Sequence, residues 1–295
     1  MPIVEINRLT KYYGKSRGIV EVDLSIPEGE IFGFIGPNGA GKSTTIRILM
    51  SLIHPTSGKA EVFGMDCRTE GPSIRSRIGY LPAEANYYDD MRVGAFFDYA
   101  MKFYPKSSRP RLDMLCDRLD IDRSRRISAL STGNKKKLAV AQALLHKPDL
   151  LILDEPTAGL DPLIQNRLFE LLREENARGV TIFFSSHVLS EVQKLCDRVA
   201  IIKEGRILRI ESVDRLRGSL YKEVRVEFVH PEDAATFEPP ESAAVRRDGR
   251  QVSFLYNGRV DNLLRLFVPL EIENLWMDEP DLDDVFLHFY EKEDV

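Results

Sequence analysis

Short apolar runs and polar turns alternate along the first part of the chain and predict its first strands and its first helix. Apolar and polar positions alternate over residues 4–9 and 20–26, which indicates two strands of a partly exposed antiparallel sheet, with a turn at residues 27–30. Residues 31–35 are apolar apart from one glycine, as expected for a strand buried on both faces. Helical spacing of apolar positions over residues 43–53 predicts a helix directly after a glycine-rich loop.

Further along the chain, buried strands alternate with helices. Residues 88–147 have few β-branched runs and predict mostly helix. The runs at 150–153 and 180–184 predict two more buried strands, separated by a helix over residues 162–178, and residues 199–210 predict a hairpin. Since this alternation is typical of parallel sheets, the expected fold class is α/β, with a mostly parallel sheet flanked by helices.

The pattern changes near residue 213. Apolar and charged residues alternate over 224–228 and around 252–254, which predicts half-buried strands, with a turn at residues 248–249. Apolar residues within 282–289 lie on one face of a predicted final helix. We therefore expect a domain over residues 1–215, with an antiparallel β subdomain and a helical subdomain at about 85–147, followed by a small α+β domain over residues 216–295.

Composition constrains the number of domains, the kinds of partner and the compartment of the protein. The chain has 295 residues, 43% of them hydrophobic, which is enough for one large and one small domain. A formal net charge of −5 gives no reason to expect long-range attraction to nucleic acid or anionic lipid. Cys67, Cys116 and Cys196 show no metal-ligand spacing and fit a reducing compartment. The sequence shows no signal peptide and no apolar run near the roughly 20 residues of a spanning helix.

The glycine-rich loop after the buried strand at 31–35 has the pattern of a phosphate-binding loop, Gly36-Pro37-Asn38-Gly39-Ala40-Gly41-Lys42-Ser43. Its glycines allow backbone N–H groups to surround a phosphate, and the positive end of the following helix faces the same anion. Lys42 can place its charge on the β and γ phosphates, and the Ser43 hydroxyl can bind Mg²⁺. The sequence therefore predicts a core of the P-loop NTPase type that binds MgATP. The expected nucleotide contacts here come from Gly36, Asn38, Gly39, Ala40, Gly41, Lys42, Ser43 and Thr44.

Two adjacent carboxylates, Asp154 and Glu155, follow directly on the buried strand at 150–153. In a parallel sheet the carboxyl ends of strands line the ligand crevice, so both carboxylates are expected close to the phosphate loop. Asp154 is then expected to bind Mg²⁺ together with Ser43, and Glu155 to polarise the attacking water.

Two more segments indicate which class of phosphate-loop protein the chain resembles. Leu130-Ser131-Thr132-Gly133-Asn134 opens a helix over residues 135–145, and His187 follows a predicted strand end. With the phosphate loop, the Asp154-Glu155 pair and the loop at residues 158–161, they resemble, in order and approximate spacing, the nucleotide-binding subunit of ABC transporters. The resemblance covers residues 1 to about 215.

The resemblance implies a head-to-tail dimer, expected to be a homodimer, with two ATP molecules at its interface. Each site would combine one copy's phosphate loop with the other copy's signature segment, Ser131, Thr132, Gly133 and Asn134. His187 would act as the switch histidine at the γ-phosphate, so that the expected catalytic residues are Glu155, His187 and Lys42. Asp161 would belong to the nucleotide-contacting loop. Tyr13 would stack on adenine, with Tyr12 as the neighbouring alternative.

The sequence departs from the commonest family pattern at two places. Thr132 and Asn134 replace a glycine and a glutamine of the signature segment, a change that keeps a backbone N–H and an amide. Ala83 stands where the family usually has a glutamine that contacts Mg²⁺ and the attacking water. Either Glu84 replaces it as a metal ligand through a shifted loop, or the contact is missing, and we expect slow hydrolysis.

The partners follow from the same resemblance. Residues 84–99 lie where family members receive helices of a polytopic membrane subunit, with Tyr87 and Tyr88 as the expected surface residues. The lysine run Lys135-Lys136-Lys137 is interpreted as a solvated helix face. The ending at 279–286 resembles exporter-type subunits linked to drug, antibiotic or lipid efflux. We expect an ATPase that powers an exporter from the cytoplasmic face of the membrane, without nucleic acid. The alternative is a soluble ABC-type ATPase that acts on ribosomes or DNA.

Overall fold

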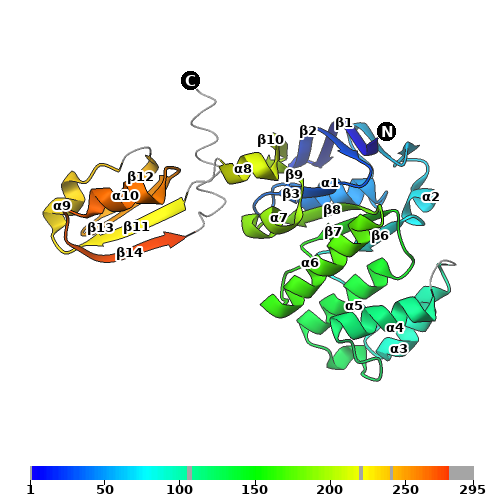
Figure 1. Ribbon diagram of the computed structural model, residues 1–295. Helices are drawn as coiled ribbons and strands as arrows, with labels where there is room; N and C mark the ends of the chain where they lie inside the picture. The colour runs from blue at the N-terminus through cyan, green and yellow to red at the C-terminus, as the bar shows by residue number, and fades with distance from the viewer. Residues whose placement is uncertain (1, 105–107, 219–221, 240–241, 279–295) are drawn as a thin grey trace. The chain divides into compact units, whose positions relative to one another are not determined.

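The structure, a computed structural model, describes residues 2–104, 108–218, 222–239 and 242–278 (Figure 1). The chain divides into two compact units, Met1–Val213 and Asp214–Val295. The predicted final helix at 282–289 and the segment 279–286 lie outside the described residues. No helix among the described residues is long and apolar enough to cross a membrane.

A six-stranded sheet forms the centre of the first unit. Its strand order is β10-β9-β3-β8-β7-β6, and all neighbours run parallel except the hairpin of β9 and β10. The strands are β3 (Ile31–Ile35), β6 (Ile78–Leu81), β7 (Leu150–Asp154), β8 (Thr181–Ser186), β9 (Arg198–Lys203) and β10 (Arg206–Ser212). Every residue of β3, β7 and β8 is buried, which confirms the prediction of strands covered on both faces.

A second, antiparallel sheet has the order β2-β1-β4-β5 and includes the two partly exposed strands predicted at the start of the chain. Its strands are β1 (Pro2–Tyr13), β2 (Ser16–Pro27), β4 (Ser57–Val62) and β5 (Met65–Asp66). Inward side chains of β1 and β2, such as Ile6, Leu9 and Ile19, join Phe32 and Phe34 of the central sheet in one hydrophobic core. The two sheets therefore share a core, which also includes Ala40 of the loop between β3 and α1.

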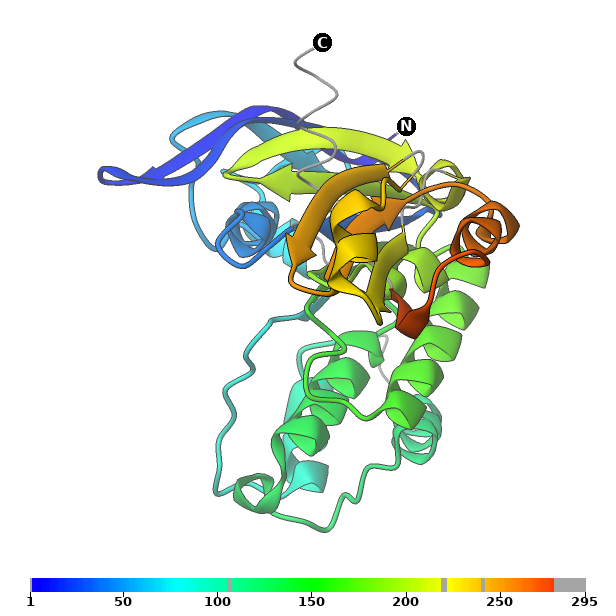
Figure 2. The same cartoon turned by 90° about the vertical axis from the view of Figure 1, so that its left-hand side faces the viewer.

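Seven helices and a 3-10 turn are described in the first unit. They are α1 (Lys42–Leu49), α2 (Gly71–Arg75), α3 (Val93–Met101), α4 (Arg109–Leu119), the turn Ile127–Ala129, α5 (Thr132–Leu144), α6 (Pro162–Ala177) and α7 (Leu189–Leu195). Helices α3, α4 and α5 lie together on one side of the unit in both views (Figures 1 and 2). The prediction that the first helix reaches residue 53 was wrong, because the helix ends at Leu49 and Ser51 takes a left-handed φ of 55°.

The second unit contains a four-stranded antiparallel sheet of order β12-β13-β11-β14. Its elements are β11 (Lys222–Phe228), α9 (Pro231–Thr236), β12 (Ser242–Asp248), β13 (Gln251–Tyr256), α10 (Val260–Phe267) and β14 (Ile272–Asp278); α8 (Val213–Gly218) precedes them. The predicted alternation is confirmed, because Val224, Val226 and Phe228 are buried with Val252 and Phe254 in one core. The unit is α+β.

Candidate active site

The phosphate loop connects the end of β3 to the start of α1, as the sequence predicts. Gly41 adopts a φ of 113°, which side chains rarely tolerate, and a Cβ at Gly36 would lie 2.2 Å from the carbonyl oxygen of Ile202. The ammonium of Lys42 is buried and donates hydrogen bonds to the carbonyl oxygens of Gly36, at 2.6 Å, and Pro37, at 3.3 Å. The loop thus curves around its own lysine.

A cavity of about 260 Å³ opens over this loop. Most residues predicted to contact nucleotide line it, together with Arg17 and Gly18, which the sequence analysis did not single out. The full lining is Tyr13, Arg17, Gly18, Pro37, Asn38, Gly39, Ala40, Gly41, Lys42, Ser43, Thr44, Ala83 and Glu155. Tyr13, which is about half exposed, lines the cavity, whereas Tyr12 is not among the lining residues.

Asp154 lies at the carboxyl end of β7, where the parallel neighbour β8 places Ser185 beside it. The Ser43 hydroxyl donates to Asp154 Oδ2 at 2.8 Å, and the Ser185 hydroxyl donates to Asp154 Oδ1 at 2.7 Å. Both carboxylate oxygens of this buried residue therefore have a hydroxyl donor, and Asp154 meets the phosphate loop at Ser43. The register of β7 and β8 could have identified Ser185, because Asp154 and Ser185 each lie at the end of a predicted strand.

Glu155 occupies a strained position between two charged or ionisable partners. Its φ is 50°, a left-handed conformation that costs of order 1 kcal/mol or more for a residue other than glycine. Lys42 Nζ lies 3.2 Å from Glu155 Oε1, and His187 Nδ1 lies 2.8 Å from Glu155 Oε2. Of the three residues predicted to be catalytic, Lys42 and His187 thus each contact the carboxylate of the third, Glu155.

The geometry suits Mg²⁺ bound mainly by oxygen. Among the described residues there is no cluster of three or more histidine, cysteine or carboxylate side chains that could hold a metal ion without other ligands. Mg²⁺, however, usually keeps several waters or substrate phosphates besides one or two protein oxygens, and Ser43 and Asp154 offer two oxygens 2.8 Å apart. Ala83 lines the cavity, whereas Glu84 is exposed and is not among its lining residues.

The signature segment lies at the start of α5 and does not line this cavity. Ser131 is the N-cap, and its hydroxyl accepts a hydrogen bond from the backbone N–H of Asn134 at 3.3 Å. Gly133 packs so closely that an added Cβ would lie 2.9 Å from the carbonyl oxygen of Gly159. Asp161 is the N-cap of α6 and accepts from the N–H of Ile164 at 3.0 Å. Ser131 and Thr132 remain exposed, so their backbone and side chains are accessible to another molecule.

The prediction of a solvated lysine face at residues 135–137 was wrong for two of the three residues. Lys136 and Lys137 are buried, and only Lys135 is partly exposed. Periodicity alone does not predict this burial, because it depends on the packing of α5 against β6, α4 and α3. Lys136 donates to the carbonyl oxygens of Pro82, at 3.5 Å, and Ala83, at 3.1 Å.

The aromatic segment at residues 84–99 borders a cavity of about 410 Å³. Tyr88 is 67% exposed, as expected of a surface residue. Tyr87, the other predicted surface residue, is partly buried, because its ring packs edge-on against Phe96 and its hydroxyl donates to the carbonyl oxygen of Lys135. Burial raises the pKa of the Tyr87 hydroxyl. The cavity is lined by Asn86, Tyr87, Tyr88, Phe96, Tyr99, Ala100, Phe103, Tyr104 and Gln142.

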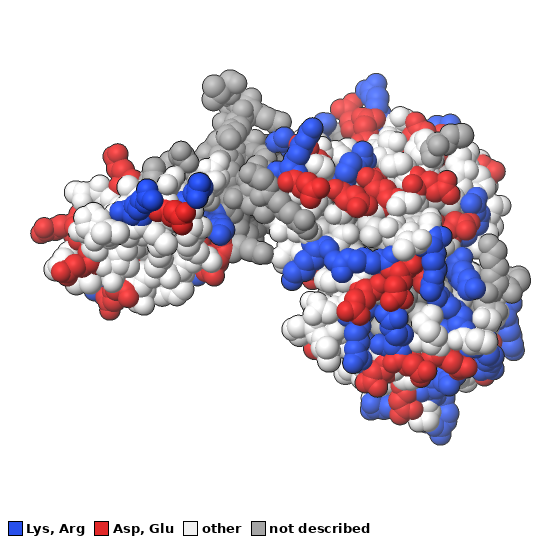
Figure 3. Space-filling view, in the orientation of Figure 1, with Lys and Arg blue, Asp and Glu red and all other residues white. Residues whose placement is uncertain are grey.

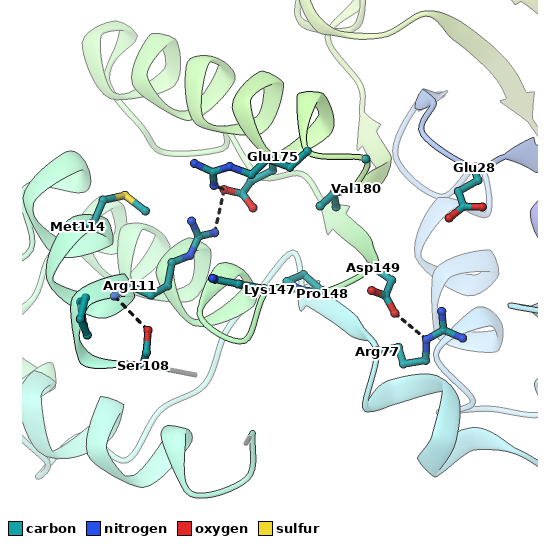
Figure 4. Close-up of a pocket in the computed structure, with 13 residues that line it drawn as sticks. Glu28, Arg77, Ser108, Arg111, Met114, Lys147, Pro148, Asp149, Glu175 and Val180 are labelled. Atoms are coloured by element: carbon teal, nitrogen blue, oxygen red, sulfur yellow. Dashed lines mark hydrogen bonds and ion pairs between the residues drawn. The ribbon is translucent and has the colours of Figure 1, made fainter. Parts of the chain in front are cut away.

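A larger cavity, of about 850 Å³, opens where β6, β7 and β8 begin (Figure 4). It therefore lies at the amino ends of these strands, whereas the phosphate loop lies at the carboxyl end of β3. Several of its charged side chains form ion pairs. Arg77 Nε lies 2.7 Å from Asp149 Oδ2, and the guanidinium of Arg111 on α4 points at Glu175 on α6, with Nη2 2.8 Å from Oε1. The first pair joins the segments that precede β6 and β7, and the second joins α4 to α6.

Comparison with known proteins connects this site to one family. Residues 19–158 match the sequence pattern of the family described as ABC transporter. The bacitracin transport ATP-binding protein of Bacillus licheniformis is 33% identical over 296 residues, which cover 97% of this chain and 96% of that protein. The daunorubicin/doxorubicin resistance ATP-binding protein of Streptomyces peucetius is 31% identical and covers 96% of this chain and 91% of its own length.

A solved structure supports the same relationship. A protein described as the ATP binding subunit of an ABC transporter superposes with a TM-score of 0.68 at 28% sequence identity. The match covers 73% of this chain and 92% of that chain. The fold that carries the phosphate loop is therefore shared with this protein.

Proposed function

Because this chain belongs to the ATP-binding proteins of ABC transporters, in which ATP hydrolysis drives transport, we propose that it powers an exporter by binding MgATP between two of its own copies. The observation that carries the proposal is the contact of Lys42, Glu155 and His187 beside a phosphate loop whose Ser43 meets Asp154. A phosphate loop, a carboxylate base and a metal-binding pair are the parts that phosphoryl transfer to water requires.

The contacts of Lys42 and His187 with Glu155 suggest how ATP activates the site. The ammonium of Lys42 contacts Glu155 Oε1 and two loop carbonyl oxygens. A bound γ-phosphate offers Lys42 stronger partners, so its contact with Glu155 is expected to weaken and leave Oε1 available to the attacking water. His187, whose Nδ1 contacts Oε2, keeps the carboxylate oriented and is proposed to contact the γ-phosphate with its other ring nitrogen. Mg²⁺ held by Ser43 and Asp154 would neutralise charge on the β and γ phosphates.

The second half of the site is proposed to come from another copy of the chain. Ser131 and Thr132 are exposed at the N-terminus of the 13-residue helix α5, where the helix dipole and free N–H groups favour an anion. They do not line the phosphate cavity of their own chain. Their use in trans explains why an anion-binding helix end lies outside that cavity.

Export is proposed from the relatives. One is described by bacitracin transport and another by resistance to daunorubicin and doxorubicin, and both align along almost the whole chain. Export is the direction of transport that gives resistance to a drug. The aromatic cavity around Tyr88 is the proposed contact for the polytopic membrane subunit. In Figure 3, basic and acidic side chains are interspersed over the visible face, which gives the ribosome or DNA alternative no support.

Complementation between two inactive variants tests the shared site. Lys42→Ala removes the charge of the phosphate loop, and Ser131→Arg blocks the signature segment, so each protein alone should lose turnover. In an equimolar mixture, half of the dimers would be mixed and contain one intact composite site, and ATPase activity should reappear. Activity of the mixture no higher than the sum of the separate variants would contradict a site formed in trans.

Copurification from detergent-solubilised membranes tests the transport assignment. The proposal predicts that a tagged chain retains a polytopic membrane protein, and that Tyr88→Asp weakens this association without changing ATP binding. Retention of ribosomal proteins or DNA in place of a membrane protein would instead favour the alternative function.

A further inference from the structure

Lys136 is a buried cation whose position the proposed chemistry does not explain. Its side chain is 6% exposed, although an unpaired ammonium in a protein interior is costly. The ammonium donates to the carbonyl oxygens of Pro82 and Ala83. A lysine has three donors and no acceptor, so two carbonyl oxygens are suitable partners for it.

The two acceptors belong to a wall of the phosphate cavity. Pro82 and Ala83 follow β6, and Ala83 lines the cavity together with Lys42 and Glu155. Lys136 lies in α5, the helix that begins with the signature segment. One side chain therefore connects the signature helix to the cavity wall at the position where the chain lacks the glutamine expected from the family.

Two further contacts connect α5 to the same stretch. The Tyr87 hydroxyl donates to the carbonyl oxygen of Lys135 at 3.2 Å, and Lys135 Nζ lies 3.1 Å from Asp89 Oδ1. The contact of Lys135 with Asp89 is exposed, whereas Lys136 is a buried residue and its two hydrogen bonds are partly buried. Residues 82–89 are thus attached to α5 by several contacts. Lys136 is the most deeply buried of the residues that make them.

The charge of Lys136 also acts on the two carboxylates of the site. Burial lowers the pKa of Lys136, and the charges of Asp154 and Glu155 oppose that shift. The buried ammonium is therefore attracted to the two carboxylates of the site, in addition to its hydrogen bonds with Pro82 and Ala83.

We propose that Lys136 is a positioning residue for ATP hydrolysis, which fixes the Pro82–Ala83 wall to the signature helix. The inference rests on the proposed function, because it assumes that a partner's nucleotide engages the start of α5. When that engagement fixes α5, Lys136 transmits the constraint to the wall beside Glu155. Its backbone acceptors make the link independent of the side chain at residue 83.

Steady-state ATPase kinetics of Lys136→Met test this role. The variant removes the charge and both hydrogen bonds while keeping an unbranched chain of similar length. We expect kcat to fall about 10- to 100-fold, as when a catalytic arrangement is displaced, with the KM for ATP changed less than about threefold. Lys136→Arg, which retains charge and donors, should recover a large part of the lost kcat.

Lys135→Met is the matched control, because it removes the same charge from the adjacent, partly exposed residue of the same helix. It should keep kcat within about twofold of the wild type. Thermal unfolding checks that each variant is folded at the assay temperature, and Lys136→Gln replaces Lys136→Met if the latter is not. Unchanged kcat in the folded variant, or an equal loss in Lys135→Met, would overturn the inference. Absence of ATPase activity in the wild type would instead refute the proposed function.

Discussion

The buried ion pair between Arg111 and Glu175 should be essential for the stability of the first unit. The side chains are 5% and 2% exposed, and Glu175 Oε1 lies 2.8 Å from Arg111 Nη2 and accepts a hydrogen bond from Arg178 Nη1. Glu175→Gln removes the carboxylate and leaves the Arg111 guanidinium buried, with the carbonyl oxygen of Leu144 as its remaining described partner. Removing one partner of a buried pair typically costs about 3–5 kcal/mol.

The expected shift is large enough to measure by thermal unfolding. For a unit of this size about 2–4 °C corresponds to each kcal/mol, so Glu175→Gln should lower the Tm by roughly 6–20 °C. Circular dichroism without nucleotide follows mainly the helices of the first unit, which contains α1 to α7. The only tryptophan of the chain, Trp276, lies in the second unit, so its fluorescence reports that unit separately.

Glu174→Gln provides a matched control one residue away on the same helix. Glu174 also pairs with an arginine of α4, Arg118, but the two side chains are 44% and 36% exposed. Exposed pairs contribute about 0–1 kcal/mol, so this variant should shift the Tm by only a few degrees at most. Equal shifts for Glu174→Gln and Glu175→Gln would refute the argument that burial makes the pair essential.

Three further predictions concern the site. Ala83→Gln should raise ATP turnover by restoring an amide at the cavity wall; unchanged turnover and Mg²⁺ affinity would count against that role. Gly133→Ala should lower turnover more than about tenfold in a folded protein, because its Cβ would lie 2.9 Å from the Gly159 carbonyl oxygen and displace the signature segment. Ser185→Ala should weaken Mg²⁺-dependent ATP binding and destabilise folding by about 1–3 kcal/mol, measured by calorimetry and by denaturant unfolding.

The parts of the site that the sequence predicts are those determined locally or by strand order. The phosphate loop is one continuous segment, and Asp154 follows a strand whose carboxyl end must lie at the ligand edge of a parallel sheet. Its contact with Ser43, 111 residues away, follows from that geometry. The alternating strands of the second unit were predictable for the same reason, because burial of one face imposes a period of two.

The features that the sequence mispredicts or does not reveal depend on packing between distant segments. Lys136 contacts a carbonyl oxygen 54 residues earlier in the chain, and no local pattern distinguishes it from the partly exposed Lys135. Tyr87 is partly buried because its ring meets Phe96 and its hydroxyl meets α5. The Arg111–Glu175 pair likewise depends on how α4 packs against α6. Tertiary contacts of this kind override the expectation that charged and polar residues face water.

The central claim, a MgATP site shared by two copies with Glu155 as the base, is tested most directly by Glu155→Gln. The variant keeps the shape of the side chain and removes its basicity. Light scattering with MgATP should show a stable particle of twice the mass of the 33.6 kDa chain, with negligible hydrolysis. A particle that remains monomeric while ATP turns over at the wild-type rate would contradict the account.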